Sequence, residues 1–464
     1  MVQHQETIAA LSTPVGTAGL AVIRMTGPEA LAIADQVFMS GKKKKPSQAS
    51  SHTALYGWIQ DGSEKIDEVI LLVLKAPHSF TGEDTVEINC HGGMYICHRV
   101  LEVLMKAGAQ PAEPGEFSKR AFLNGRLDLA QAEAVMDMIG ARTAYSLRAA
   151  VKQRGNALHG AIESMRSRLI DMMVKVEVNI DYPEYDEAPE IDDNEIMAVC
   201  KNVQEACRKL LDTADAGRFL AEGINVALIG MPNVGKSSLL NRLLGRQRAL
   251  VTNIPGTTRD VLEEMLDLDG IPLRMVDTAG IRTTEDEIEK LGIERSYAAL
   301  EESDLVLMIL DASRSIKEEE KEIVRHMGAK PYLLLLNKSD ISRETPAQVA
   351  EALREIDEKI EDKILPISAL QGSGIEALTE KIKNLFFAGD VLINEEPLLA
   401  NLRQKKALME AEEALDAALA AVGLPQDLVL IDVQRAADSL GQVIGRSTRE
   451  DVIAEIFSRF CLGK

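Results

Sequence analysis

The chain lacks any long apolar run, and this absence argues against a protein embedded in a membrane. Nowhere in the sequence do about 18 consecutive apolar residues occur, the length that a membrane-spanning helix needs. The first residues, Met1 to Gly16, carry neither the basic segment nor the apolar core of a secretory signal. We therefore expect a cytoplasmic protein without stable membrane insertion.

Cysteine and positive charge are also scarce. The five cysteines are odd in number and few for 464 residues, which argues against a disulfide framework and for a reducing compartment. Acidic residues outnumber basic ones by 73 to 52, so the formal net charge is −21. This balance opposes broad binding to a nucleic-acid backbone, which needs clustered Lys and Arg. Any contact with RNA must therefore be local or shared with a partner.

The residues that are present suffice for several hydrophobic cores, and the length favours two or three domains. Residues 1–120 mix short apolar runs with Gly and Pro, which predicts an α+β domain. Residues 121–217 and 386–464 have helical periodicity, whereas residues 218–385 alternate short apolar runs with helical patterns. We predict a multidomain α+β and α/β protein in which an α/β domain is inserted into a helical one.

Residues 230–237, Gly-Met-Pro-Asn-Val-Gly-Lys-Ser, fit the P-loop pattern between an apolar strand and a helix. In such a loop backbone N–H groups close around phosphates, the catalytic Lys236 reaches the β/γ oxygens, and the Ser237 hydroxyl can ligate Mg²⁺. This context predicts a nucleoside-triphosphate site. Its predicted contacts here are Asn233, Val234, Gly235, Lys236, Ser237 and Ser238.

Three later strings specify guanine. Residues 277–280, Asp-Thr-Ala-Gly, end a strand and would face Mg²⁺ and the γ-phosphate. Asp340 can accept hydrogen bonds from guanine N1–H and the 2-amine, whereas adenine would leave the carboxylate unpaired. Residues 368–370 can then offer backbone N–H groups to guanine O6. The ordered set predicts a Ras-like P-loop G domain that binds GTP or GDP and hydrolyses GTP, with contacts from Asp277, Thr278, Ala279, Gly280, Asn337, Lys338, Asp340, Ser368, Ala369 and Leu370.

Residues 252–258 lie between the P-loop and the second string and form a candidate switch segment. A Thr in such a segment completes the Mg²⁺ shell, and Thr258 is the candidate to do so together with Ser237. All seven residues are predicted nucleotide contacts: Thr252, Asn253, Ile254, Pro255, Gly256, Thr257 and Thr258.

The water-orienting residue of better-known GTPases is missing. They carry a Gln directly after the Asp-Thr-Ala-Gly string, but here that position is Ile281, which has no hydrogen-bonding group. Another group must position the attacking water. Residues 285–289 supply several carboxylates, and their spacing alone does not choose among them.

Further strings resemble one family over essentially the whole chain. Gly-Thr-Thr-Arg-Asp at 256–260, Phe-Cys-Leu-Gly-Lys at 460–464, and N-terminal strings at 81–87, 91–93 and 114–126 are similar to those of the MnmE (TrmE) tRNA-modification GTPases, which are TrmE-Era-EngA-like. The resemblance implies a homodimer with a folate-binding and dimerisation domain at the N-terminus. It also implies a flavin-dependent partner, MnmG (GidA), with which the family modifies C5 of the wobble uridine (position 34) of certain tRNAs. The one-carbon unit would come from 5-formyl- or 5,10-methylene-tetrahydrofolate.

The resemblance also implies roles for single residues. Carried over by position, Glu289 would orient the attacking water, and a bound K⁺ would supply the charge that other GTPases take from an arginine finger. Cys461 is either a reactive thiol near the folate or a small helix-end residue, and the sequence does not decide. The folate residues would be Arg24, Glu87, Arg126 and Lys464, and the K⁺ ligands Asn233, Thr252, Ile254 and Thr257.

A ribosome-assembly, RNA-binding G protein is the competing interpretation, because the G domain alone fits it equally well. Such a protein should carry a basic appendage after the G domain. Residues 386–464 are instead helical, with no basic cluster beyond 403–406, which favours tRNA modification. The sequence does not reveal which tRNAs are substrates or which step each protein performs.

Overall fold

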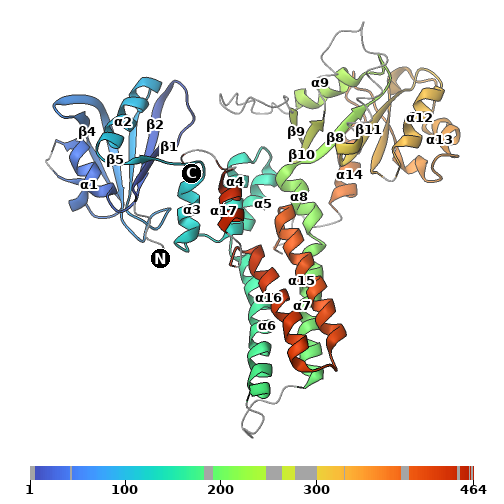
Figure 1. Ribbon diagram of the computed structural model, residues 1–464. Helices are drawn as coiled ribbons and strands as arrows, with labels where there is room; N and C mark the ends of the chain where they lie inside the picture. Colours follow the sequence, from blue (N-terminus) through green and yellow to red (C-terminus); the bar gives the residue numbers. More distant parts are fainter. Residues whose placement is uncertain are drawn as a thin grey trace. The chain divides into compact units, whose positions relative to one another are not determined.

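The computed structural model describes residues 6–41, 44–181, 192–246, 264–276, 300–328, 330–387, 397–446, 450–458, 460 and 463. These residues form two compact units. One unit is made of both ends of the chain, up to Met136 and from Ala437, and the other of the described residues from Asp137 to Ala436. Figure 1 labels many of the helices and strands of each unit. No helix in these ranges is both long and apolar enough to cross a membrane.

A seven-stranded sheet in the order β3-β4-β5-β6-β2-β1-β7 dominates the first unit. Neighbouring strands are antiparallel, except for the parallel pair β1 and β7. The strands are β1 (Ile8–Leu11), β2 (Ala18–Thr26), β3 (Phe38–Ser40), β4 (Thr53–Asp61), β5 (Glu64–Leu74), β6 (Thr85–Gly92) and β7 (Gln110–Pro111), with the short helix η1 (Pro46–Gln48) before β4.

Helices α1 (Ala30–Val37) and α2 (Met94–Lys106) cover one face of this sheet, as Figure 1 shows. Ile23 and Met25 of β2 are fully buried on that face, because successive side chains of a strand point to opposite faces. The other face exposes 50–67% of several large apolar side chains, namely Leu20, Tyr56 and Ile70.

Both ends of the chain meet within the first unit. Helices α3 (Glu116–Leu123) and α17 (Glu450–Ser458) pack together, and Phe457 is buried in their common cluster. Gly463 lies against β1, where its carbonyl oxygen accepts a hydrogen bond of 3.0 Å from Ser12 Oγ. A Cβ atom added to Gly463 would come within 2.4 Å of the Leu11 oxygen, so the backbone approach requires glycine.

The second unit contains a helical region whose two parts are far apart in sequence. Helix α7 packs along α15, where Gln204 Nε2 donates to Asp416 Oδ1 at 2.5 Å and Arg208 Nε donates to Glu412 at 2.6 Å. Because α7 precedes the α/β region and α15 follows it, that region is inserted into the helical one. The helices are α5 (Ala144–Arg154), α6 (Ala157–Asp181), α7 (Asp193–Leu211), α8 (Ala214–Glu222) and α15 (Leu402–Ala421), while the residues of α4 (Leu129–Gly140) and α16 (Gln426–Val443) are divided between the two units.

The inserted region is a six-stranded sheet in the order β13-β12-β11-β8-β10-β9. Every neighbouring pair is parallel except β9 and β10. The strands are β8 (Ile224–Ile229), β9 (Glu264–Leu268), β10 (Ile271–Val276), β11 (Leu305–Asp311), β12 (Tyr332–Asn337) and β13 (Ile364–Pro366).

Helices cover both faces of this mostly parallel sheet, which explains why its central strands are almost wholly apolar. One core cluster joins the sheet to α9 and α14, and a second joins the other face to α12 and α13. These helices are α9 (Lys236–Arg246), α12 (Glu318–His326), α13 (Pro346–Leu353) and α14 (Ile375–Phe386), with the short helices η2 (Ser339–Ile341) and η3 (Ile360–Lys363). The predicted fold class is confirmed, and the predicted domain boundaries stay a prediction.

Candidate functional site

The phosphate loop follows β8 directly and ends where α9 begins at Lys236. Its backbone is left-handed at Asn233, with φ at 63°, and at Gly235, with φ at 104°. A Cβ atom on Gly235 would lie 2.3 Å from Asn337 Nδ2. The loop therefore needs glycine at 235 to let the Asn337 side chain approach its backbone.

Lys236 folds back over the loop that precedes it. Its Nζ atom donates to the carbonyl oxygens of Gly230 at 2.6 Å and Met231 at 3.0 Å. Burial lowers the pKa of Lys236, because a desolvated ammonium group is less stable than one in water. Anionic phosphate oxygens at this place would compensate for the lost hydration.

Asn337 connects the phosphate loop to the loop of residues 368–370. This side chain is almost fully buried, donates from Nδ2 to Val234 O at 2.7 Å, and accepts at Oδ1 from Ala369 N at 2.9 Å. Since β12 ends at Asn337, the carboxyl edge of the parallel sheet holds both loops. Ligands of open α/β sheets bind at this edge.

The two residues on either side of Ser339 are held by charged or polar partners. Asp340 Oδ1 accepts a hydrogen bond of 2.7 Å from Ser368 Oγ. Lys338 has a left-handed backbone, and its Nζ atom lies 2.6 Å from Asp311 Oδ2. Burial raises the pKa of Asp311, but hydrogen bonds from Lys338 and Ser313 outweigh it and leave the pKa below its ordinary value.

The structure brings together the predicted residues of the P-loop, of 337–340 and of 368–370. It does not test the remainder of the predicted nucleotide and ion sites. Those predictions fall outside the described residues: Thr252, Asn253, Ile254, Pro255, Gly256, Thr257, Thr258, Asp277, Thr278, Ala279, Gly280 and Glu289. Sequence reasoning missed Arg242 and Asp311, which contact the site through space and belong to none of the recognised strings.

Arg24 and Glu87 form an ion pair on the sheet of the first unit. They are opposite each other on β2 and β6, and Arg24 Nη2 lies 2.8 Å from Glu87 Oε1. The Arg24 guanidinium carbon lies 5.4 Å from the centre of the Phe80 ring and 5.8 Å from that of Phe117. Arg24 thus lies against two aromatic rings, and the side chains of Arg24 and Glu87 are 16% and 20% exposed.

Arg126 lies beside the same loop as Phe80. Its Nε atom donates to Ser79 O at 3.1 Å, and its Cγ atom would be 3.1 Å from a Cβ added to Gly82. Lys464 and Cys461 are outside the described residues. Their neighbour Gly463 contacts the end of β1, which pairs with β2 through Ala10 and Arg24 among others.

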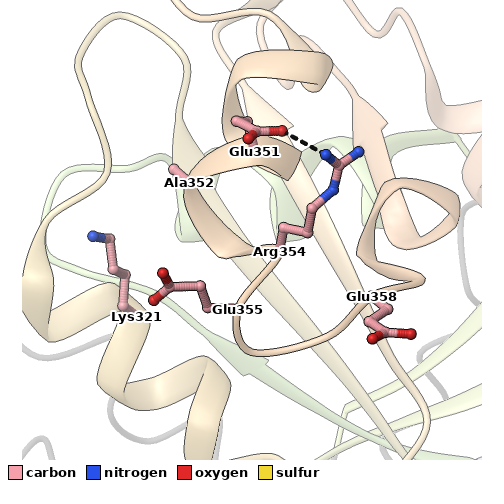
Figure 2. A pocket seen from close by; sticks show the side chains of 6 residues that line it. All are labelled: Lys321, Glu351, Ala352, Arg354, Glu355 and Glu358. Atoms are coloured by element: carbon pink, nitrogen blue, oxygen red, sulfur yellow. Dashed lines mark ion pairs between the residues drawn. The ribbon is translucent and has the colours of Figure 1, made fainter.

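A separate surface hollow lies on the second unit near α12 and α13. Figure 2 shows Arg354 paired with Glu351, with an N–O distance of 3.0 Å. No predicted site residue lines it, and its only other basic residue, Lys321, pairs with Glu318 outside the hollow. The lining residues are Lys321, Glu351, Ala352, Arg354, Glu355 and Glu358.

Comparison with known proteins covers nearly the whole chain. Residues 7–126 match the GTP-binding protein TrmE N-terminus, and residues 129–461 match the MnmE helical domain. The tRNA modification GTPase MnmE of Listeria welshimeri is 45% identical over 461 residues, with 99% of both chains covered. The chain belongs to the MnmE family. Another member, from Acetivibrio thermocellus, is 45% identical over 464 residues and is also covered to 99%.

Partial similarity extends beyond the MnmE family. A variant of Aquifex aeolicus Era, solved with GDP and aluminium fluoride, is 30% identical with a TM-score of 0.27. The match covers 41% of this chain and 66% of that one.

Proposed function

We propose that this chain, as a member of the MnmE family, is a GTPase that acts in tRNA modification. The observation that carries the proposal is Asn337, which joins the phosphate loop at Val234 to the loop at Ala369. The two loops that would hold the phosphates and the base are therefore parts of one site. The family match over 99% of the chain supplies the tRNA context.

Guanine selectivity would come from Asp340. Its carboxylate can accept hydrogen bonds from guanine N1–H and the 2-amine, and the Ser368 hydroxyl holds it in place at 2.7 Å. Adenine has a lone pair at N1, so it would leave a desolvated carboxylate without a donor. GTP and GDP are thus the expected ligands.

Ser237 and Asn233 fit the ions that the family implies. In the described part of the chain the Ser237 hydroxyl makes no hydrogen bond and the side chain is exposed at the start of α9, so this oxygen can ligate Mg²⁺. Asn233 is exposed and offers an amide oxygen to K⁺. A bound K⁺ would supply positive charge near the γ-phosphate. Thr258 would join the Mg²⁺ shell, and Thr252, Ile254 and Thr257 the K⁺ shell, while Glu289 would orient the water.

The Arg24–Glu87 pair fits a tetrahydrofolate. Only Oε1 of Glu87 is engaged by Arg24, and in the described part of the chain Oε2 accepts no hydrogen bond. A free carboxylate oxygen, on a residue whose partner Arg24 lies against the Phe80 and Phe117 rings, suits a flat pterin ring that carries N–H donors. Arg126, and Lys464 at the chain end, would complete the site. The 5-formyl or 5,10-methylene form would supply the one-carbon unit for C5 of the wobble uridine.

The proposed assembly is a homodimer that works in the cytoplasm with tRNA and the flavin-dependent partner MnmG (GidA). The exposed side chains of Leu20, Tyr56 and Ile70 on the uncovered sheet face support a contact between two copies, because their burial there would remove apolar surface from water. The net charge of −21 supports the expectation that a partner shares the contact with RNA.

Two measurements test the proposed function. The purified full-length protein should hydrolyse GTP in the presence of Mg²⁺ and K⁺ and leave ATP intact. Cells that lack the protein should lose the modified wobble uridine, as seen by mass analysis of their tRNA. Unchanged wobble uridines together with defective ribosomal subunits would instead identify a ribosome-assembly GTPase.

A further inference from the structure

Arg242 reaches from the phosphate-binding helix to the loop that would read the base. It lies on α9, whose first residue is Lys236. Its Nε atom donates to Ala369 O at 3.1 Å, and its Nη2 atom donates to Leu370 O. The guanidinium carbon lies against Gly372, where an added Cβ would be 3.6 Å away.

This contact determines which way one peptide group faces. In a trans peptide the C=O of one residue and the N–H of the next point in opposite directions. Because Arg242 holds the C=O of Ala369, the N–H of Leu370 must point away from Arg242. The other side of Ala369 is fixed as well, since its N–H donates to Asn337 Oδ1.

The Leu370 N–H is the donor that this loop leaves free. Its neighbours are engaged inside the loop: Ser368 N donates to Ser373 O, Gln371 N to Ser368 Oγ, and Gly372 N to Ser368 O. In the described part of the chain the Leu370 N–H makes no hydrogen bond, and the residue is 76% exposed.

The free donor belongs to the loop that touches Asp340. Ser368 Oγ binds the carboxylate that would face guanine N1–H, and O6 is carried by C6, the ring atom next to N1. We propose that Arg242 is a positioning residue for base recognition: it orients the loop so that the Leu370 N–H reads guanine O6. This inference rests on the proposed function, because it takes guanine as the base. It ties base recognition to the helix that holds the phosphates.

A comparison of nucleotides separates this role from simple stabilisation of the domain. GDP and IDP both carry O6, whereas 6-thioguanosine diphosphate keeps N1–H and the 2-amine but presents sulfur, a weaker acceptor. Affinities of the full-length protein for all three are measured by titration calorimetry with Mg²⁺. In Arg242→Met, which keeps the length but not the donors, affinity for GDP and IDP should fall about five- to tenfold. Affinity for the thio nucleotide should fall much less.

Two further variants complete the test. Arg242→Lys keeps a donor and should restore part of the GDP affinity. Arg354→Ala removes a surface arginine paired with Glu351 in the same domain (Figure 2) and should change no affinity. Thermal unfolding of each variant shows that the fold persists.

Each remaining outcome has a definite meaning. An equal loss for all three nucleotides, or no loss at all, would overturn the role of Arg242 while leaving a GTP-binding protein. Failure of the unmodified protein to bind GDP would overturn the proposed function and this inference with it.

Discussion

At the scale of single residues, Gly235 is a position where the phosphate loop lies close against the side chain of Asn337. Gly235→Ala would place a methyl group 2.3 Å from Asn337 Nδ2, at a φ of 104° that side chains rarely adopt. We expect GDP affinity to fall at least about tenfold, because Asn337 must move off Val234. Gly245→Ala is the matched control, since open space surrounds that glycine on α9. Equal GDP affinities in the two variants would contradict the proposed packing.

The carboxylate of Asp340 gives a second prediction at this scale. Asp340→Asn replaces an acceptor by a group that also donates, so the N1–H and 2-amine of guanine lose their partner. GTP affinity should fall about 100-fold. Xanthosine triphosphate carries an oxygen in place of the 2-amine of guanine, so it should become the better ligand. Competition between the two nucleotides measures this change in nucleotide preference. A variant that still prefers GTP would show that Asp340 does not read the base.

Single residues could be predicted from sequence only where a motif fixes their surroundings. Asp340 and Lys236 stand in strings that follow apolar strands, so their place at the sheet edge could be expected. Arg242 could not be found in this way, because its contact with Ala369 joins residues 127 positions apart. Nothing in its own helix distinguishes it from a surface arginine.

At the scale of elements, the chain end is held by β1 although it comes last in the sequence. Deleting Leu462 to Lys464 should spare GTP hydrolysis, because the nucleotide loops belong to the inserted domain. Wobble-uridine modification should be lost with the folate site. Gly463→Ala tests the same contact without removing residues, because its methyl group would lie 2.4 Å from the Leu11 oxygen and force the chain away from β1. Measurements of GTP turnover and of tRNA modification should therefore diverge, and modification that survives the deletion would count against the folate assignment.

Elements could be predicted where their pattern is strong. Strands β10, β11 and β12 lie inside the sheet and consist of nearly continuous apolar residues, so they were predictable. Strand β9, Glu-Met-Leu-Asp-Leu, is an antiparallel edge strand with charged residues among apolar ones, and the sequence did not reveal it. The packing of α7 along α15 was expected from the inserted domain, but the partners Gln204 and Asp416 were not.

At the scale of the whole molecule, hydrolysis should depend on a cation. Ile281 cannot orient water, so the site should be a poor catalyst until K⁺ and Glu289 complete it. Turnover in K⁺ should clearly exceed turnover in Na⁺ at equal ionic strength, because the smaller ion fits the same oxygen ligands badly. Single-turnover GTP hydrolysis in each salt measures the difference, and identical rates would refute the dependence on potassium.

The same hydrolysis assay tests which carboxylate orients the attacking water. Glu289→Ala should abolish most of the K⁺-stimulated rate and leave GTP affinity nearly unchanged, because this group acts on the water and not on the bound nucleotide. Glu285→Ala, on the same segment, serves as the control and should keep the rate. Normal hydrolysis by the Glu289 variant would show that another residue orients the attacking water.

The account as a whole claims that this guanine site serves tRNA modification. The direct test replaces the chain in cells by the Asp340→Asn variant and measures the wobble uridines of their tRNA by mass analysis. Because cells hold GTP and very little xanthosine triphosphate, the account predicts that the modified uridine disappears while the variant protein remains folded and present. Modified uridine at the level of the unaltered protein would contradict it.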